Sequence, residues 1–207
     1  MRGNFGDVMV VDTATHRLML LRGAEEHRAL LGAEYLADWA RDQPAWSGMA
    51  LMETLAFLRP APSRVLCLGL GAGTVPVELR TRGIMTDVVE RDAAVTALAK
   101  KHFAYGEMPM PGKTVHADAF EFISDYRTDS VYDVILSDLF DGSTSRLYTS
   151  AHFGRAKRWL RPGGTFALNI VSFYSGPHAA LTAAVATALG STFKHVRAFA
   201  DHQPTER

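Results

Sequence analysis

A chain of 207 residues is long enough to bury the core of one domain and short for two. Lys plus Arg and Asp plus Glu each number 22, which argues against binding to nucleic acid or to an anionic membrane surface. No apolar run reaches the roughly 18 residues of a membrane span, and the N-terminus lacks the apolar core of a signal peptide, so we expect a soluble, cytoplasmic protein.

Cysteine and histidine usage argues against disulfides and metal. The single cysteine, Cys67, falls in a continuous apolar run, where we expect it to be part of the core, and it has no partner for a disulfide within the chain. The eight histidines show no ligand spacing such as H-x-x-x-H. We therefore predict no metal site.

The N-terminal region predicts a small β/helical extension. Short β-like runs at 7–11 and 17–21 flank a turn-rich interval and predict a hairpin. Apolar residues at helical spacing predict helices over 25–39 and 46–58. The hairpin is too small to form a domain by itself.

After the prolines at 60 and 62, strand and helix patterns alternate, which divides the chain into an extension (1–60) and a cofactor-binding catalytic domain (61–207). Strands are predicted at 65–69, 85–90, 113–116, 132–137, 165–171 and 193–199, and helices near 75–82, 92–103, 118–125, 149–160 and 177–189. Such alternation predicts an α/β fold, a doubly wound and mostly parallel sheet with helices on both faces. In this fold the ligand binds at the carboxyl ends of the strands.

A glycine-rich turn after a buried strand is the first candidate site. The apolar run 65–68 suits a strand buried on both faces, and Gly69, Gly71 and Gly73 follow at alternate positions. Glycines let the backbone turn sharply and approach a ligand closely. Glu90 ends the next strand about 20 residues later, where a carboxylate can accept hydrogen bonds from ribose hydroxyls. These features predict a nucleoside-cofactor site.

The glycine spacing favours one class of nucleoside. Thr74 occupies the place where a G-x-G-x-x-G dinucleotide fingerprint needs its third glycine, whereas G-x-G-x-G is complete. The tighter spacing is more typical of S-adenosylmethionine enzymes. A nicotinamide or flavin site and a purely structural turn stay open as alternatives.

Carboxylates follow two further predicted strands. Asp118 could accept the adenine amino group, but it precedes a helix and could equally be its N-cap. Asp138 follows the strand 132–137, with Asp141 three residues later. A carboxylate there can take the proton of an acceptor amine and hold the nitrogen in line with an electrophilic carbon. The alternative is that this pair only shapes a turn.

The order and spacing of these motifs resemble the polyamine aminopropyltransferase family, whose type member is spermidine synthase, within the class I S-adenosylmethionine-dependent methyltransferase fold. The resemblance covers nearly the whole chain. It rests on the β-segment Val8-Met9-Val10-Val11-Asp12 through Arg17 to Gly23, the glycine loop Arg64 to Gly73, Glu90-Arg91-Asp92, Ala117-Asp118-Ala119 and Ser137-Asp138-Leu139-Phe140-Asp141.

The resemblance implies roles for these residues. The segment Glu90-Arg91-Asp92 matches the family's ribose-binding "E-x-D", and Ala117-Asp118-Ala119 matches its adenine-contacting "G-D-A". Asp138 matches the family's presumed general base, and Asp141 completes its "D-x-x-D".

Departures from the family pattern concern the acceptor and the cofactor. Trp46 and Ser47 replace a Tyr and a Gln or His in the acceptor segment, and Glu26 stands where an active-site Gln is usual. Trp46 could stack on a ligand or simply pack. Ala72 replaces an Asp that binds the aminopropyl nitrogen of decarboxylated S-adenosylmethionine. Without this carboxylate, intact S-adenosylmethionine is not repelled, so we expect Ala72→Asp to shift preference toward the decarboxylated form.

The expected function is therefore that of a spermidine-synthase-like transferase, which moves an aminopropyl group from an S-adenosylmethionine-type cofactor to a small-molecule acceptor that we expect to be an amine. Methyl transfer, or another reaction of intact S-adenosylmethionine, is the alternative that Ala72 favours. A catalytically silent cofactor-binding protein also stays open.

The fold usually ends with a seventh strand after the sixth, but only residues 201–207 follow the run ending at Phe199. The resulting sheet edge suggests a homodimer or a trimmed sheet, with the N-terminal hairpin as the other candidate contact.

Overall fold

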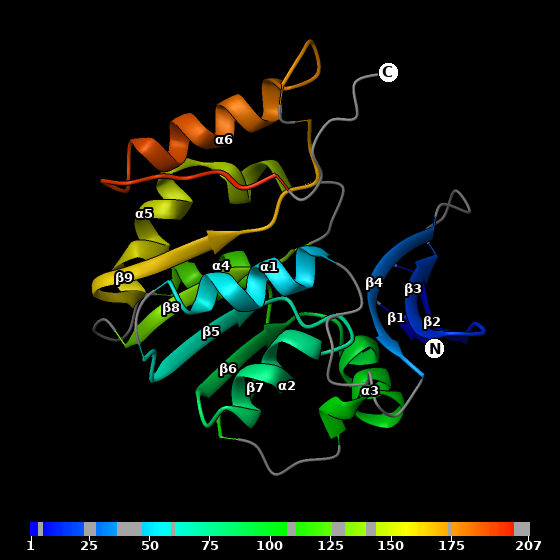
Figure 1. The fold of residues 1–207 in the computed structure, drawn as a ribbon. Helices are drawn as coiled ribbons and strands as arrows, with labels where there is room; N and C mark the ends of the chain where they lie inside the picture. Colours follow the sequence, from blue (N-terminus) through cyan, green and yellow to red (C-terminus); the bar gives the residue numbers. More distant parts are fainter. Residues whose placement is uncertain are drawn as a thin grey trace.

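Two β-sheets organise the protein (Figure 1). The structure is a computed structural model that describes residues 1–3, 6–22, 28–36, 47–58, 61–106, 111–125, 131–139, 144–173 and 175–200. The first sheet has the strand order β1-β2-β3-β4, and the second has the order β7-β6-β5-β8-β9. Within these ranges, no helix combines the length and the apolar character needed to cross a membrane.

The N-terminal sheet is antiparallel throughout. Its strands are β1 (Arg2–Gly3), β2 (Gly6–Asp12), β3 (His16–Arg22) and β4 (Arg28–Tyr35). The pairing of β2 with β3 confirms the predicted hairpin.

The prediction of a helix over 25–39 was wrong, because residues 28–35 form β4. This strand pairs with β3 from end to end, from Arg22↔Arg28 to His16↔Tyr35. A short apolar run fits both the helical and the strand period, and pairing with a neighbouring strand overrides the local preference. Residues 32–34 are buried, whereas Leu30 faces solvent.

The second sheet is entirely parallel. Its strands are β5 (Arg64–Leu68), β6 (Met85–Glu90), β7 (Thr114–His116), β8 (Tyr132–Ser137) and β9 (Leu160–Leu168). The helices are α1 (Ser47–Ala56), α2 (Thr74–Thr81), α3 (Ala93–His102), α4 (Ala119–Ser124), α5 (Ser150–Trp159) and α6 (Ala180–Gly190), with single 3-10 turns η2 (Ala104–Gly106) and η3 (Thr144–Tyr148).

Helices cover both faces of this sheet. Val65 and Cys67 pack with side chains of α1, α2 and α3, whereas Leu66 and Leu68 pack with side chains of α4 and α5. Alternate residues of β5 therefore serve two hydrophobic cores, as a strand buried on both faces requires. The arrangement confirms the predicted α/β, doubly wound fold and the core position of Cys67.

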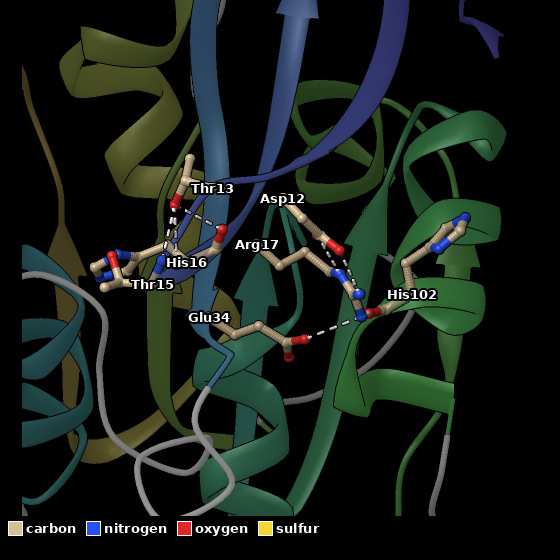
Figure 2. A network of polar contacts seen from close by, with 7 residues as sticks. All are labelled: Asp12, Thr13, Thr15, His16, Arg17, Glu34 and His102. Atoms are coloured by element: carbon tan, nitrogen blue, oxygen red, sulfur yellow. Dashed lines mark hydrogen bonds and ion pairs between the residues drawn. The ribbon is translucent and has the colours of Figure 1, made fainter.

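Arg17 fixes the N-terminal sheet against the end of α3 (Figure 2). Its guanidinium makes two hydrogen bonds to the Asp12 carboxylate, of 2.7 and 2.8 Å, and donates to the carbonyl of His102 at 2.8 Å. It also lies 3.7 Å from the buried Glu34 carboxylate of β4. Because the last carbonyls of a helix have no partners within it, a cation there is stabilising. One side chain thus joins β2, β4 and α3.

The predicted strand at 193–199 is absent, so that prediction was wrong. Phe193 stacks on Phe166 of β9 with ring centroids 5.8 Å apart, but residues 195–200 continue without strand structure. A strand requires a hydrogen-bonding neighbour, and the described residues provide none beyond β9, which is the last strand of its sheet.

Candidate functional site

The glycine loop joins β5 to α2 at the carboxyl end of the parallel sheet. Gly69, Gly71 and Gly73 all have positive φ, at 94°, 55° and 86°, which side chains rarely tolerate. A Cβ atom on Gly69 would overlap the carbonyl oxygen of Asp138, and one on Gly71 would overlap that of Leu31. The glycines are therefore required by close backbone approach as well as by conformation.

Strand β4 lies directly against this loop. Ala72 is 4% exposed, and a Cβ on Gly32 of β4 would overlap its backbone and side chain. Thr74 also donates through its hydroxyl to the carbonyl of Ala33, at 3.4 Å. The N-terminal sheet thus packs against one side of the glycine loop through β4. The sequence analysis missed this contact because it predicted the β4 segment as a helix.

Glu90, at the end of β6, braces the loop from the other side. Its two carboxylate oxygens accept hydrogen bonds from the backbone N–H groups of Leu70, at 3.1 Å, and Asp92, at 2.8 Å. Burial raises the pKa of this carboxyl, and the two backbone hydrogen bonds oppose the shift. Because a carboxylate offers about four acceptor positions, Glu90 keeps capacity for the hydroxyls of a sugar.

Asp118 follows β7 and caps α4. Its Oδ1 accepts from the N–H groups of Phe120, at 2.9 Å, and Glu121, at 3.2 Å, which confirms the N-cap interpretation. Its Oδ2 accepts from the guanidinium of Arg146 at 2.8 Å, and Arg91 lies 3.8 Å away. Ala119 is the first residue of α4 and is buried. An adenine amino group at this carboxylate would share Oδ2 with Arg146.

Asp138 stands at the end of β8, next to the glycine loop. Its N–H donates to the carbonyl of Leu68 at 2.9 Å, and its Oδ1 accepts from the amide Nδ2 of Asn169 at 2.9 Å. The side chain is open to solvent, yet the protein around it removes enough water to raise the pKa of the carboxyl, which the Asn169 hydrogen bond opposes. A carboxylate with a raised pKa and an accessible oxygen can act as a base.

The structure therefore gathers most of the predicted cofactor residues along one edge of the sheet. Contacts link Asp138 to the glycine loop and the loop to Glu90, and the N–H of Ala117 donates to the carbonyl of Glu90 at 3.3 Å, next to Asp118. Among the described residues, no group of three or more His, Cys, Asp or Glu side chains could hold a metal ion.

The structure does not place the predicted acceptor-binding residues or the second predicted catalytic carboxylate, Asp141, relative to this edge. Glu26, Trp46 and Asp141 lie outside the described residues, and Ser47 is known only as the first residue of α1.

The sequence analysis missed two polar residues at the site, Arg146 and Asn169. Asn169 directly follows β9 as Asp138 follows β8, so the rule that ligands meet strand ends would have found it. Arg146 carried no comparable signal, because it reaches Asp118 from η3.

Comparison with solved structures identifies the class of fold. A probable spermidine synthase from Corynebacterium glutamicum aligns with a TM-score of 0.76 at 20% identity, over 94% of this chain and 70% of that one. At this identity the likeness concerns the fold alone, which is the class I methyltransferase type found in spermidine synthases.

Sequence comparison then gives the family. Residues 49–201 match the spermine/spermidine synthase domain, and the chain belongs to that family. It is 29% identical over 168 residues to a polyamine aminopropyltransferase of Aeropyrum pernix, which covers 75% of this chain and 52% of that protein. It is also 32% identical over 123 residues to an N-terminal histidine N-methyltransferase of Emericella nidulans, which covers 56% of this chain and 22% of that protein. The chain thus spans about half the length of the first relative.

Proposed function

We propose that the protein transfers an aminopropyl group from decarboxylated S-adenosylmethionine to a small-molecule amine, with Asp138 as the base. The observation that carries this proposal is the position of Asp138, whose backbone carbonyl packs against Gly69 of the glycine loop and whose carboxylate has one oxygen held by Asn169. Membership of the spermine/spermidine synthase domain family and the likeness to a polyamine aminopropyltransferase support the reaction class.

The cofactor would lie along the carboxyl edge of the sheet. The glycine loop admits it closely, Glu90 accepts from its ribose hydroxyls, and Asp118 accepts from its adenine amino group. Arg91 and Ala119 flank these two carboxylates in sequence and complete the contact surface. The proposal needs the free acceptor capacity of Glu90 and Asp118, because both already bind backbone N–H groups.

Asp138 supplies the acid–base chemistry. The bound cofactor contributes an electrophilic carbon next to a sulfonium. A protonated amine at Asp138 would give its proton to the carboxylate. Its free electron pair would then form a bond to that carbon while the carbon–sulfur bond breaks and the rest of the cofactor leaves as a neutral thioether. Asp141, three residues along the chain, would support the ammonium, and Glu26, Trp46 and Ser47 would bind the rest of the acceptor.

A second candidate is methyl transfer from intact S-adenosylmethionine. Ala72 leaves the glycine loop without the aspartate that disfavours the cofactor's own carboxylate. The likeness to a histidine N-methyltransferase points the same way. Because Ala72 packs against Gly32, an Ala72→Asp side chain would strain β4, so the affinity ratio of the unaltered protein is the better first test.

The proposal is tested by titrating the purified protein calorimetrically with both forms of the cofactor. Preference for decarboxylated S-adenosylmethionine, followed by formation of an aminopropylated amine, is the expected result. Preference for the intact form, with methylated product, would replace aminopropyl transfer by the second candidate.

Asp138→Asn tests the assigned base. Because general base catalysis contributes roughly 10²–10⁴-fold, we expect turnover to fall by at least about 100-fold while cofactor affinity is retained. Asp7→Asn, which alters a surface carboxylate of β2, is the matched control and should leave turnover unchanged. Normal turnover by Asp138→Asn would rule out this role.

A further inference from the structure

We infer that Asn169 is a positioning residue for the Asp138 carboxylate, holding one oxygen so that the other is presented to the acceptor. The inference rests on the proposed function for the identity of the acceptor, but the geometry stands apart from it. Asn169 was not among the residues expected from the sequence. Among the described residues, its side chain is the one that donates a hydrogen bond to the Asp138 carboxylate.

Backbone hydrogen bonds fix both residues at neighbouring strand ends. Strands β8 and β9 pair in register up to Ser137↔Leu168, and the N–H of Asn169 continues the ladder by donating to the carbonyl of Ser137 at 2.9 Å. The N–H of Asp138 in turn donates to the carbonyl of Leu68 at 2.9 Å. Because both main chains are held by the parallel sheet, the 2.9 Å bond from Asn169 Nδ2 to Asp138 Oδ1 joins two rigid positions.

The chemistry of an amide suits this task. An amide N–H stabilises the ionised carboxylate but brings no positive charge, so it does not neutralise the negative charge that attracts a protonated amine. An arginine or lysine in its place would pair with the carboxylate and weaken it as a base. The surrounding protein raises the pKa of Asp138 by removing water, and the Asn169 bond lowers it, which keeps the base ionised over a wider pH range.

A purely structural role for Asn169 predicts something different. Its backbone N–H continues the sheet whatever side chain the residue carries, so a change of side chain leaves the ladder in place. The positioning role concerns the side-chain amide alone. Side-chain variants therefore separate the two roles.

The decisive measurement is the pKa of the Asp138 carboxyl, determined by carbon-13 NMR in the absence of any substrate. The carboxyl signal of Asp138 is assigned by its loss in Asp138→Asn. Asn169→Leu keeps a similar volume and removes the donor, so we expect the pKa to rise by about one unit. Asn169→Asp adds a like charge and should raise it further. Thr182→Val, which removes a hydroxyl bonded to the carbonyl of Phe173 near α6, is the matched control and should leave it unchanged.

The same variants shift the acid limb of the pH dependence of kcat/KM. Below the wild-type pKa, Asn169→Leu should be about tenfold less active, because a one-unit rise in pKa leaves a tenfold smaller ionised fraction. Asn169→Ala serves as a second donor-free variant if the leucine disturbs folding. An unchanged Asp138 pKa in a folded donor-free variant would overturn the inference. A raised pKa without any aminopropyl transfer would uphold it and count against the proposed function instead.

Discussion

His152 is a histidine that the fold holds in its neutral form. Its side chain is 1% exposed, its ring stacks on Phe120 at 5.6 Å, and its Nδ1 has no hydrogen-bond partner among the described residues. Burial lowers the pKa of this imidazole to about 4, and the nearby Arg155 and Arg146 contribute to the shift. Because the pKa is lower in the folded than in the unfolded state, the unfolded chain binds the proton more readily. Stability is therefore lost as the pH falls from about 6.5 toward 4.

This linkage predicts the effect of replacing the imidazole. His152→Phe keeps an aromatic ring against Phe120 and removes the titrating group. The free energy of unfolding should therefore decrease less between pH 7 and pH 4.5 in this variant than in the unaltered protein. We expect the difference to be roughly 1–3 kcal/mol, measured by urea unfolding at the two pH values. His152→Leu should show the same flattening, whatever its stability at pH 7. Equal pH dependence in all three proteins would contradict the account.

At the scale of elements, β4 connects the N-terminal sheet to the cofactor edge. It packs on the glycine loop at Gly32 and is joined to β2 and α3 through Arg17 and Glu34. The loop contacts β4 where Ala72 packs against Gly32 and where the Thr74 hydroxyl donates to the Ala33 carbonyl at 3.4 Å. We expect the position of β4 to depend also on how well the whole N-terminal sheet is docked. Arg17 donates a hydrogen bond across from that sheet to the His102 carbonyl at the end of α3.

Arg17→Met therefore tests the docking. The methionine keeps an apolar stem but cannot bind the His102 carbonyl or the two carboxylates, so we expect Tm to fall by roughly 2–8 °C and cofactor affinity to fall severalfold. Arg22→Met is the matched control, because Arg22 also lies on β3 and pairs with a carboxylate at 2.8 Å, that of the exposed Asp7 within the same sheet. Calorimetric titration and thermal unfolding of both variants give the two readouts. Equal effects of the two substitutions would show that Arg17 does not couple docking to binding.

The same element shows what sequence reasoning can and cannot reach. The parallel strands from β5 to β8 and the glycine loop follow from local patterns, because buried strands and glycines at fixed spacing leave a signature within a few residues. Strand β4 left no such signature, since its structure depends on pairing with β3. Asn169 was within reach as a strand-end residue, whereas the bond from Arg146 to Asp118 and the packing of Gly32 on Ala72 depend on contacts between distant segments.

At the scale of the molecule, the two sheets share one hydrophobic core. Val8 and Met19 of the first sheet belong to the same buried cluster as Val65 and Val88 of the second. The division at residues 60 and 61 is therefore proposed as a division of function, with the extension forming walls around a cofactor site built on the second sheet. A cytoplasmic location likewise stays a prediction.

The edge of the second sheet leads to the final prediction, that the protein forms a homodimer. Strand β9 has no neighbour on its outer side among the described residues, and large apolar side chains are exposed in the chain that follows it, with Val171 81% and Phe173 63% exposed. Unpaired strand edges and exposed apolar groups both favour association. The N-terminal sheet is the competing contact, because Val11 of β2 is also exposed.

Light scattering gives the mass in solution, and a value near twice the 22.7 kDa of the chain is the expected result. Two charged variants then locate the contact. If β9 and the following segment form it, Phe173→Glu should return the protein to a monomer, since a charge buried at an apolar interface is strongly unfavourable, while Val11→Glu should leave the dimer intact. The reverse pattern would assign the contact to the N-terminal sheet. A monomer in the unaltered protein would exclude both surfaces and leave β9 as a free edge in solution.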